Sequence, residues 1–198
     1  FEPRFFELKF GADGGFPATY AGVAFTGSID RIDVNARGEA IIIDYKHKAA
    51  QALSSYAVQK SAVEQNPEGD MPSHEVLPRH VQAIIYAQVI RTYLKSRNLT
   101  SVGAMYLGTH QNYALYGAAP ESYINKIFGL SDEQKPSKGM LSCVAGDTVG
   151  AFNEYLDAWE DKIKQAVERM LNGDIHAHAL DKEACAYCPV MNCSERKR

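Results

Sequence analysis

The sequence lacks several features that would assign the protein to a common class. In its 198 residues there is no apolar run of about 18 residues, which a membrane-spanning helix would need, and no signal-peptide pattern opens it. It has no G-x-x-x-x-G-K-[ST] motif, so the nucleotide-binding loop of helicases and other P-loop enzymes is missing. Its net charge of −3 argues against a chain that is basic throughout. A local basic groove for nucleic acid stays possible.

Length and composition favour one domain, with room for a small appendage. A chain of this size with 45% hydrophobic residues can bury about 70% of its unfolded surface. We expect a main domain over residues 1–180 and a cysteine-rich element over residues 181–198. The first residue is Phe1 rather than Met, and the sequence starts directly in an apolar stretch. We therefore expect a fragment of a longer protein or a processed form of it.

Cysteine is scarce and unevenly placed. Cys143 stands alone, whereas Cys185, Cys188 and Cys193 crowd the C-terminal end. Disulfide frameworks usually spread their cysteines, while a tight C-x2-C followed by another Cys is typical of metal or cluster ligands in a reducing compartment. This pattern predicts a cytoplasmic protein.

The first 46 residues predict β-strands. We expect strands within residues 3–11, 19–34 and 39–46, the last two joined by the turn "NARG", and these would form an antiparallel meander. Two further strands are expected within residues 100–109 and 112–117.

Two helices are expected. Pro78 would open the first, and its apolar stripe would consist of Val81, Ile85, Val89 and Tyr93. The second starts at Phe152 and ends at Gly173. Residues 118–149 show no clear helical or strand periodicity. The order of elements predicts a mixed α/β (α+β) fold.

Two aspartates and a lysine at the predicted strands suggest metal chemistry. In a strand, residues two apart share a face, so Asp44 and Lys46 point the same way. Asp30 can approach Asp44 if the two strands pair as a hairpin. Two carboxylates brought together repel each other unless a cation lies between them, and Mg²⁺ or Mn²⁺ suits such oxygen ligands. A nearby lysine can orient water or stabilise charge developing on a phosphate. The pattern fits metal-assisted phosphodiester hydrolysis.

Simpler interpretations stay open at this point. A D-x-K pair at a strand end is common without any catalytic role, and Asp30 with Arg31 and Asp33 could equally form a solvated turn. The pair Gln82 and Tyr86, taken alone, could be ordinary helix surface.

In order along the chain, these motifs resemble a known nuclease family. "GSIDRID…IIIDYK" followed by Q-x-x-x-Y at Gln82 and Tyr86 is similar to the PD-(D/E)xK nuclease superfamily, in particular its RecB/AddB-type branch. "FFELKFG" also resembles the glutamate-bearing strand that precedes the core there. The resemblance implies a restriction-endonuclease-like core, a central mixed sheet flanked by helices.

The resemblance also implies roles for individual residues. Asp30, Asp44 and the backbone carbonyl of Tyr45 would bind Mg²⁺ or Mn²⁺, and Lys46 would position the attacking water or stabilise charge. Gln82 and Tyr86 lie four residues apart on one helix face and would hold DNA or order the site.

The C-terminal tail resembles AddB-type subunits, in which three cysteines help to ligate a [4Fe–4S] cluster. Cys185, Cys188 and Cys193 would be those ligands, although the last gap has four residues where about five are expected. Such a cluster needs four thiolates, and the family's fourth would lie before Phe1. A Zn²⁺ site with His176 or His178, or three free thiols, is the alternative.

The implied function is that of a DNA nuclease domain, exonuclease rather than endonuclease, in a helicase–nuclease or exonuclease of DNA repair and recombination. Its substrate would be a single strand or a duplex end, and its partner a helicase domain or subunit. A further metal ligand, often His, usually lies ahead of the first strand in this branch. His47, His74 and His80 are in the wrong place for it and are expected at the surface. A non-catalytic DNA-end-binding module and a zinc-stabilised interaction module are the alternatives.

Overall fold

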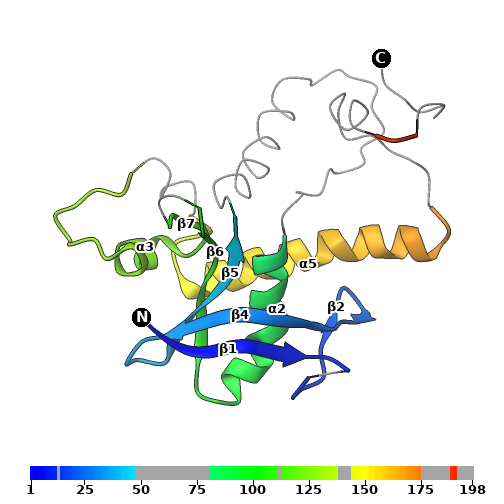
Figure 1. Ribbon diagram of the computed structural model, residues 1–198, viewed down its shortest axis with the longest axis horizontal. Helices are drawn as coiled ribbons and strands as arrows, with labels where there is room; N and C mark the ends of the chain where they lie inside the picture. The colour runs from blue at the N-terminus through cyan, green and yellow to red at the C-terminus, as the bar shows by residue number, and fades with distance from the viewer. Residues whose placement is uncertain (13, 48–80, 111–112, 138–143, 175–187, 191–198) are drawn as a thin grey trace.

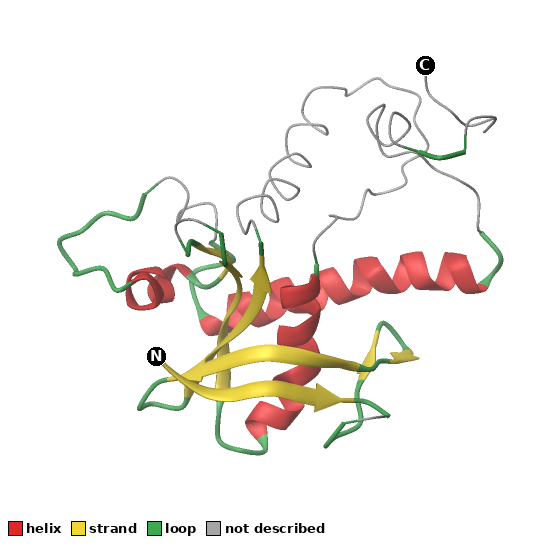
Figure 2. Ribbon diagram, viewed as in Figure 1, coloured by secondary structure: helices red, strands yellow, loops and turns green. Residues whose placement is uncertain are grey.

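The structure, a computed structural model, describes residues 1–12, 14–47, 81–110, 113–137, 144–174 and 188–190. Its centre is a five-stranded sheet in the order β1-β4-β5-β6-β7 (Figures 1 and 2). The strands are β1 (Glu2–Phe10), β4 (Gly27–Val34), β5 (Glu39–Lys46), β6 (Thr100–Gly108) and β7 (Leu115–Ala118). A small separate hairpin consists of β2 (Thr19–Tyr20) and β3 (Val23–Ala24).

The expected meander is present in β1, β4 and β5, which pair antiparallel in sequence order. The expected strand over residues 19–34 is wrong in its first half. Ala21 and Gly22 have φ of 51° and 80° there, and this positive-φ turn separates β2 from β3. β4 then starts afresh at Gly27.

The "NARG" turn between β4 and β5 is tightly bonded. The Asn35 side chain accepts hydrogen bonds from the amides of Arg37 and Glu39, and Gly38 has a φ of 77°. A Cβ atom at Gly38 would lie 2.8 Å from the carbonyl oxygen of Asn98, so the turn also packs closely on the loop before β6. This turn sets the register of the hairpin that carries both expected aspartates.

β6 pairs parallel to β5, which makes the sheet mixed. The connection between them includes helix α2 (Gln82–Lys95). Pro78, expected to open this helix, lies outside the described residues. The expected apolar stripe lies at the border of the buried face: Val81, Ile85, Val89 and Tyr93 are half-buried, and the last two pack against the core. The buried face is rotated from it and consists of Ala83, Ile84, Tyr86, Ala87, Ile90 and Leu94.

Each face of the sheet has its own apolar cluster. Ala40 and Ile42 of β5 face the larger cluster, which includes the buried residues of α2 together with Phe152 and Leu156 of helix α5. Ile41 and Ile43 face the smaller cluster, with Ile124 of helix α3. β5 is therefore buried on both faces, as expected of a strand paired in parallel.

The two remaining helices differ from expectation in detail. α3 (Glu121–Phe128) lies in the region where the sequence showed no clear helical or strand periodicity. The helix has eight residues and only Ile124 is fully buried, so its apolar pattern is too short to recognise. α5 (Val149–Leu171) starts three residues before Phe152, where the Thr148 side chain accepts a hydrogen bond from the amide of Ala151. Figure 1 shows α5 as one long rod beside α2. Among the described helices, none is both long and apolar enough to cross a membrane.

Glu39 at the start of β5 yields a prediction about stability. Burial raises the pKa of this carboxyl, but hydrogen bonds from Arg37, Asn35 and Tyr123 outweigh it and lower the pKa from 4.5 to about 2. A lowered folded-state pKa stabilises the fold above the unfolded-state pKa, and this contribution is lost as the pH falls toward 2. We expect Glu39→Gln to lower the free energy of unfolding by about 1 kcal/mol at pH 7, since Arg37 is solvent-screened. Denaturant unfolding of the wild type and the variant at pH 7 and pH 2.5 measures this difference in free energy. An equal difference at both pH values would contradict a stabilising role of the ionised carboxylate.

Candidate active site

Asp44 and Lys46 lie together at the C-terminal end of β5. Asp44 is 2% exposed, and its Oδ2 is 2.6 Å from Nζ of Lys46, whose side chain is 27% exposed. Their spacing of two residues puts both on the face of the sheet that α2 covers. A carboxylate so deeply buried is costly without a counter-charge, and Lys46 supplies it.

Lys46 connects the strand end to helix α2. Its Nζ donates a hydrogen bond of 2.7 Å to Oε1 of Gln82, and Nε2 of Gln82 donates one of 2.8 Å to the hydroxyl of Tyr86. Tyr86 is 7% exposed, and its ring meets Phe10 of β1 edge-on at 5.7 Å. The structure thus brings four of the five expected catalytic side chains into one continuous chain of contacts.

Asp30, the fifth, lies in β4 beside the end of β5. The regular pairing of β4 with β5 ends at Arg31 and Ile43, and continuing that register sets Asp30 opposite Asp44. There the carboxylate oxygen Oδ2 of Asp30 accepts a 2.8 Å hydrogen bond from the backbone amide of Tyr45. The Asp30 side chain thus accepts a hydrogen bond that a backbone carbonyl of β4 would accept in a regular ladder. Its carboxylate lies at the open end of the hairpin.

The backbone carbonyl of Tyr45 faces the same side as Asp30. In a strand, the N–H and C=O of one residue point to the same side, and those of the next residue point to the other. The amide of Tyr45 points to Asp30, whereas the carbonyl of Lys46 accepts from Thr109 on the β6 side. Asp30, Asp44 and this carbonyl would together give an oxygen-only donor set, which suits Mg²⁺ or Mn²⁺.

Two protein carboxylates would be the only charged ligands in that set. Among the residues that the structure describes, no group of three or more His, Cys, Asp or Glu could hold a metal ion. Mg²⁺ commonly binds through one or two carboxylates and keeps several waters, so the donors fit it.

The alternative of a solvated turn at Asp30, Arg31 and Asp33 is wrong. These residues lie within β4, and Asp33 is 4% exposed. Arg31 donates two hydrogen bonds of 2.6 Å to the Asp33 carboxylate, and this contact raises the pKa of Arg31 further. Asp33 and Arg31 are a structural pair on the opposite face from Asp44.

Two residues at the site were not assigned a role from the sequence. Tyr106 of β6 is paired in register with Asp44; its ring centroid lies 5.7 Å from Nζ of Lys46, and its hydroxyl accepts from the amide of Ala83. It therefore fixes the first turn of α2, next to Gln82. Only the parallel pairing of β5 and β6 reveals that Tyr106 lies next to Lys46, since in the sequence Tyr106 looks like an ordinary core residue of a strand.

The second missed residue is Glu7 of β1. Its neighbours pair with Arg31 and Ile29, which puts Glu7 across from Asp30. Its φ is 47°, unusual for a non-glycine residue in a strand, and its carboxylate accepts from the Ser28 hydroxyl at 3.3 Å. The glutamate in "FFELKFG" was the only signal in the sequence.

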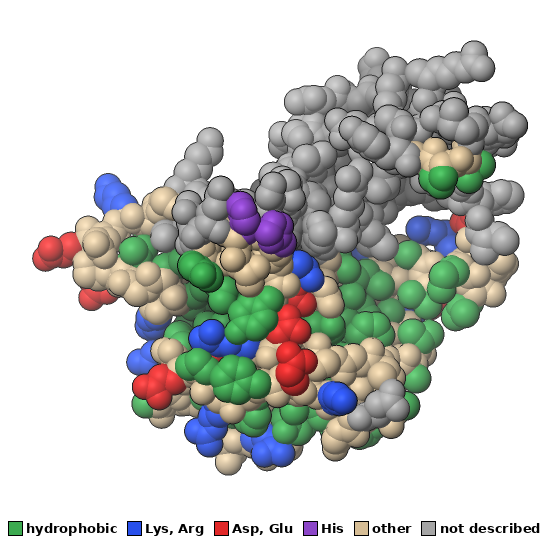
Figure 3. Space-filling view, viewed as in Figure 1, with side chains coloured by type: hydrophobic (Ala, Val, Ile, Leu, Met, Phe, Trp, Pro, Cys, Tyr) green, Lys and Arg blue, Asp and Glu red, His purple; other side chains and the backbone are tan. Residues whose placement is uncertain are grey.

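Two histidines border the same end of the sheet. His47 follows Lys46 directly, and its ring centroid lies 4.6 Å from that of His110. Both are exposed, as expected for His47. Histidine side chains accordingly gather above acidic and basic ones in Figure 3. His74 and His80 lie outside the described residues.

Most of the expected cysteine element also lies outside the described residues. This holds for Cys185, Cys193, Cys143, His176 and His178, and for the expected domain boundary after residue 180. Cys188 is described, is half-buried and carries a free thiol.

A family model described as the PD-(D/E)XK nuclease superfamily matches residues 1–193. No curated protein matches the chain.

Proposed function

Since the chain belongs to the PD-(D/E)XK nuclease superfamily, we propose that it hydrolyses DNA phosphodiester bonds with the help of Mg²⁺ or Mn²⁺. The mixed sheet flanked by helices is consistent with the restriction-endonuclease-like fold of that superfamily. The metal, the roles of individual residues and the parent protein go beyond family membership and are our proposals.

One observation carries the proposal: Lys46 contacts Asp44 and Gln82 at the same time, at 2.6 and 2.7 Å. A lysine used only to neutralise Asp44 would not need a helix residue to orient it. Here Gln82, itself held by Tyr86, fixes the direction of the ammonium toward the open strand end. A preoriented positive charge of this kind stabilises negative charge that develops on a phosphate.

The metal would be held by Asp30, Asp44 and the Tyr45 carbonyl. When bound, it would act as a Lewis acid on the phosphate and lower the pKa of a bound water. Lys46 would hold the attacking water or the phosphate oxygen. Gln82 and Tyr86 would keep Lys46 in place, and the exposed Gln82 would also contact the DNA strand.

A non-catalytic DNA-end-binding module of the same fold is the second candidate. Such a module has no need of a buried Asp44 held next to a lysine, because backbone phosphates bind to exposed cations. The cost of burying Asp44 therefore favours catalysis.

The branch of the superfamily is proposed from motifs alone. The order of "GSIDRID", "IIIDYK", Gln82 with Tyr86, and the cysteine tail supports a RecB/AddB-type domain. We propose a cytoplasmic helicase–nuclease or exonuclease of DNA repair and recombination as the parent, acting on a strand or duplex end, with a helicase domain or subunit as partner.

The role of Asp44 can be tested by a nearly isosteric change. We expect Asp44→Asn in the parent protein to abolish Mg²⁺-dependent cleavage of linear DNA, because the amide removes the charged metal ligand and keeps the shape. Asp161→Asn, an exposed aspartate on α5, is the matched control and should cleave normally. Full activity in Asp44→Asn would refute the assignment.

Lys46 should act on turnover rather than on metal binding. We expect Lys46→Ala in the parent protein to reduce the rate by about 10²-fold or more, the usual effect of losing one charge-stabilising donor. The change also removes the Lys46 ammonium from beside the buried Asp44 carboxylate, so Mg²⁺ should raise the melting temperature of the variant more than that of the wild type. Lys164→Ala on exposed α5 is the control. An equal loss of metal affinity would show that Lys46 is structural.

The cysteine tail predicts an incomplete cluster. Cys185, Cys188 and Cys193 leave a [4Fe–4S] cluster one thiolate short, so this 198-residue chain, purified aerobically, should carry no stoichiometric iron or sulfide. The longer parent should carry four irons. Four irons per chain in the 198-residue form would overturn this and make Cys143 the fourth ligand, whereas stoichiometric zinc would favour the zinc site with His176 or His178.

A further inference from the structure

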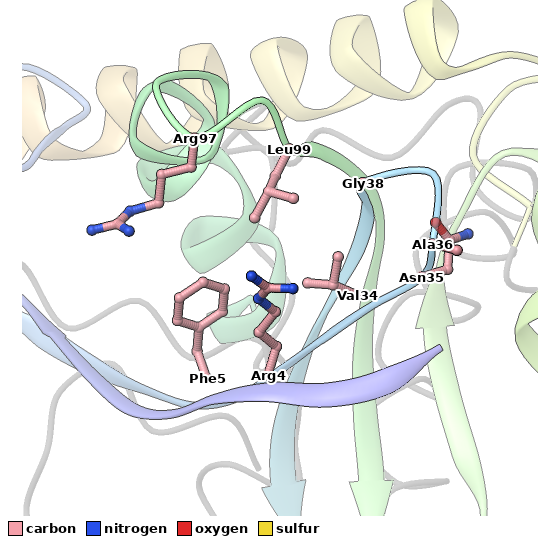
Figure 4. Close-up of a pocket in the computed structure, with 8 residues that line it drawn as sticks. All are labelled: Arg4, Phe5, Val34, Asn35, Ala36, Gly38, Arg97 and Leu99. Carbon is pink, nitrogen blue, oxygen red and sulfur yellow. The ribbon is translucent and has the colours of Figure 1, made fainter.

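A cavity of about 480 Å³ lies at the opposite end of β5 from Asp44 and Lys46. It is bordered by Arg4 and Phe5 of β1, by the turn before β5, and by the loop that follows α2 (Figure 4). Eight steps of about 3.3 Å each lead along the strand from Gly38 to Lys46, so the cavity is about 26 Å from the site and separate from it.

Apolar side chains and two arginines line the cavity together with Asn35. Figure 4 shows Phe5, Val34 and Leu99 around a common space, with the Arg4 guanidinium between Phe5 and Val34, while the Arg97 side chain extends outward from that space. Neither arginine pairs with a carboxylate within the described part of the chain. Two unpaired guanidinium groups next to an apolar surface attract a ligand that has both an anionic and a flat apolar part.

The residues around the cavity are held in place. Arg97 lies over the Tyr93 ring, with its Cζ 4.5 Å from the ring centroid. The loop after α2 is fixed by a bond from the amide of Leu99 to the carbonyl of Leu94, and it is tied to the turn by one from Thr100 to Gly38. A site built in this way loses little conformational freedom on binding.

The carboxylate of Glu39 does not cancel this charge. Glu39 follows the turn, but it already accepts hydrogen bonds from Arg37, Asn35 and Tyr123. The positive charge of Arg4 and Arg97 is thus available to a ligand.

The geometry points to a nucleotide site, in which the phosphate lies between Arg4 and Arg97 and the base packs against Phe5 and Leu99. The volume is within the range of about 300–1,000 Å³ that small-molecule sites occupy. The nucleotide can be a free mononucleotide or the terminal nucleotide of a DNA strand, since both present the same phosphate and base. This inference goes beyond the proposed catalysis and does not depend on it.

The test is NMR titration of the 198-residue chain with thymidine 5′-monophosphate in EDTA, which removes any contribution from a catalytic metal. We expect shifts at the amides of Gly38 and Leu99, and binding about tenfold weaker in Arg4→Ala and in Arg97→Ala. Thymidine, which lacks the phosphate, should bind the wild-type chain at least as weakly as thymidine 5′-monophosphate binds these variants. Both arginines are exposed, so the variants should fold, which thermal unfolding checks. Arg169→Ala on α5 is the matched control and should bind as the wild type does.

A 5′-phosphorylated oligonucleotide separates the two sources. Equal or tighter binding than the mononucleotide assigns the site to a strand end, and absence of binding assigns it to free nucleotide. The inference is overturned if the mononucleotide causes no shifts, if shifts appear only around Asp44, or if affinity is unchanged in both arginine variants.

Discussion

The ion pair of Asp44 with Lys46 is the contact on which the rest of the site depends. It sits at the end of β5, the strand that is buried on both faces, so its carboxylate has almost no access to water. Removing a charge from water costs several kcal/mol, which the Lys46 ammonium helps to offset only if its own position is fixed. Gln82 fixes Lys46, and Tyr86 fixes Gln82. The start of α2 is therefore coupled to the strand end by polar contacts as well as by apolar packing.

Tyr106 strengthens that coupling from the neighbouring strand. Its hydroxyl accepts from the Ala83 amide, one of the orphan donors in the first turn of α2, while its ring lies near the Lys46 ammonium. No side chain caps α2 at Val81, so this contact substitutes for a local cap. The same residue thus caps the start of a helix, borders an ammonium and pairs in register with Asp44.

A local irregularity in β1 and β4 places Asp30. Ile29 and Ile32 both lie in the larger core cluster although they are three positions apart, so the alternation of β4 changes phase around Asp30. Glu7 lies across from this point in β1 and has a positive φ. Regular alternation would have required either Ile29 or Ile32 to leave the core. The break frees the Asp30 carboxylate to accept from the Tyr45 amide instead.

Local patterns in the sequence predicted much of this fold, and the failures have physical reasons. The strands around "GSIDRID" and "EAIIIDYK" were found because β-branched runs and a polar turn are local signals. The parallel pairing of β6 and the contact of Tyr106 were not, since parallel pairing depends on residues about 60 apart. The buried stripe of α2 was misjudged because Ala83 and Ala87 are small and carry little weight in an apolar pattern, although they allow close packing on the sheet. The association of Asp44, Lys46, Gln82 and Tyr86 came from the order of motifs, and only the structure gives its distances.

The central claim is that Asp30, Asp44 and the Tyr45 carbonyl form one divalent-metal site. The most direct measurement is anomalous diffraction from crystals of this chain soaked in Mn²⁺. The account predicts a single strong peak in contact with both carboxylates and the Tyr45 carbonyl, with waters completing the coordination. A Mn²⁺ peak bound only at His47 and His110, or no peak between Asp30 and Asp44 at saturating Mn²⁺, would contradict it.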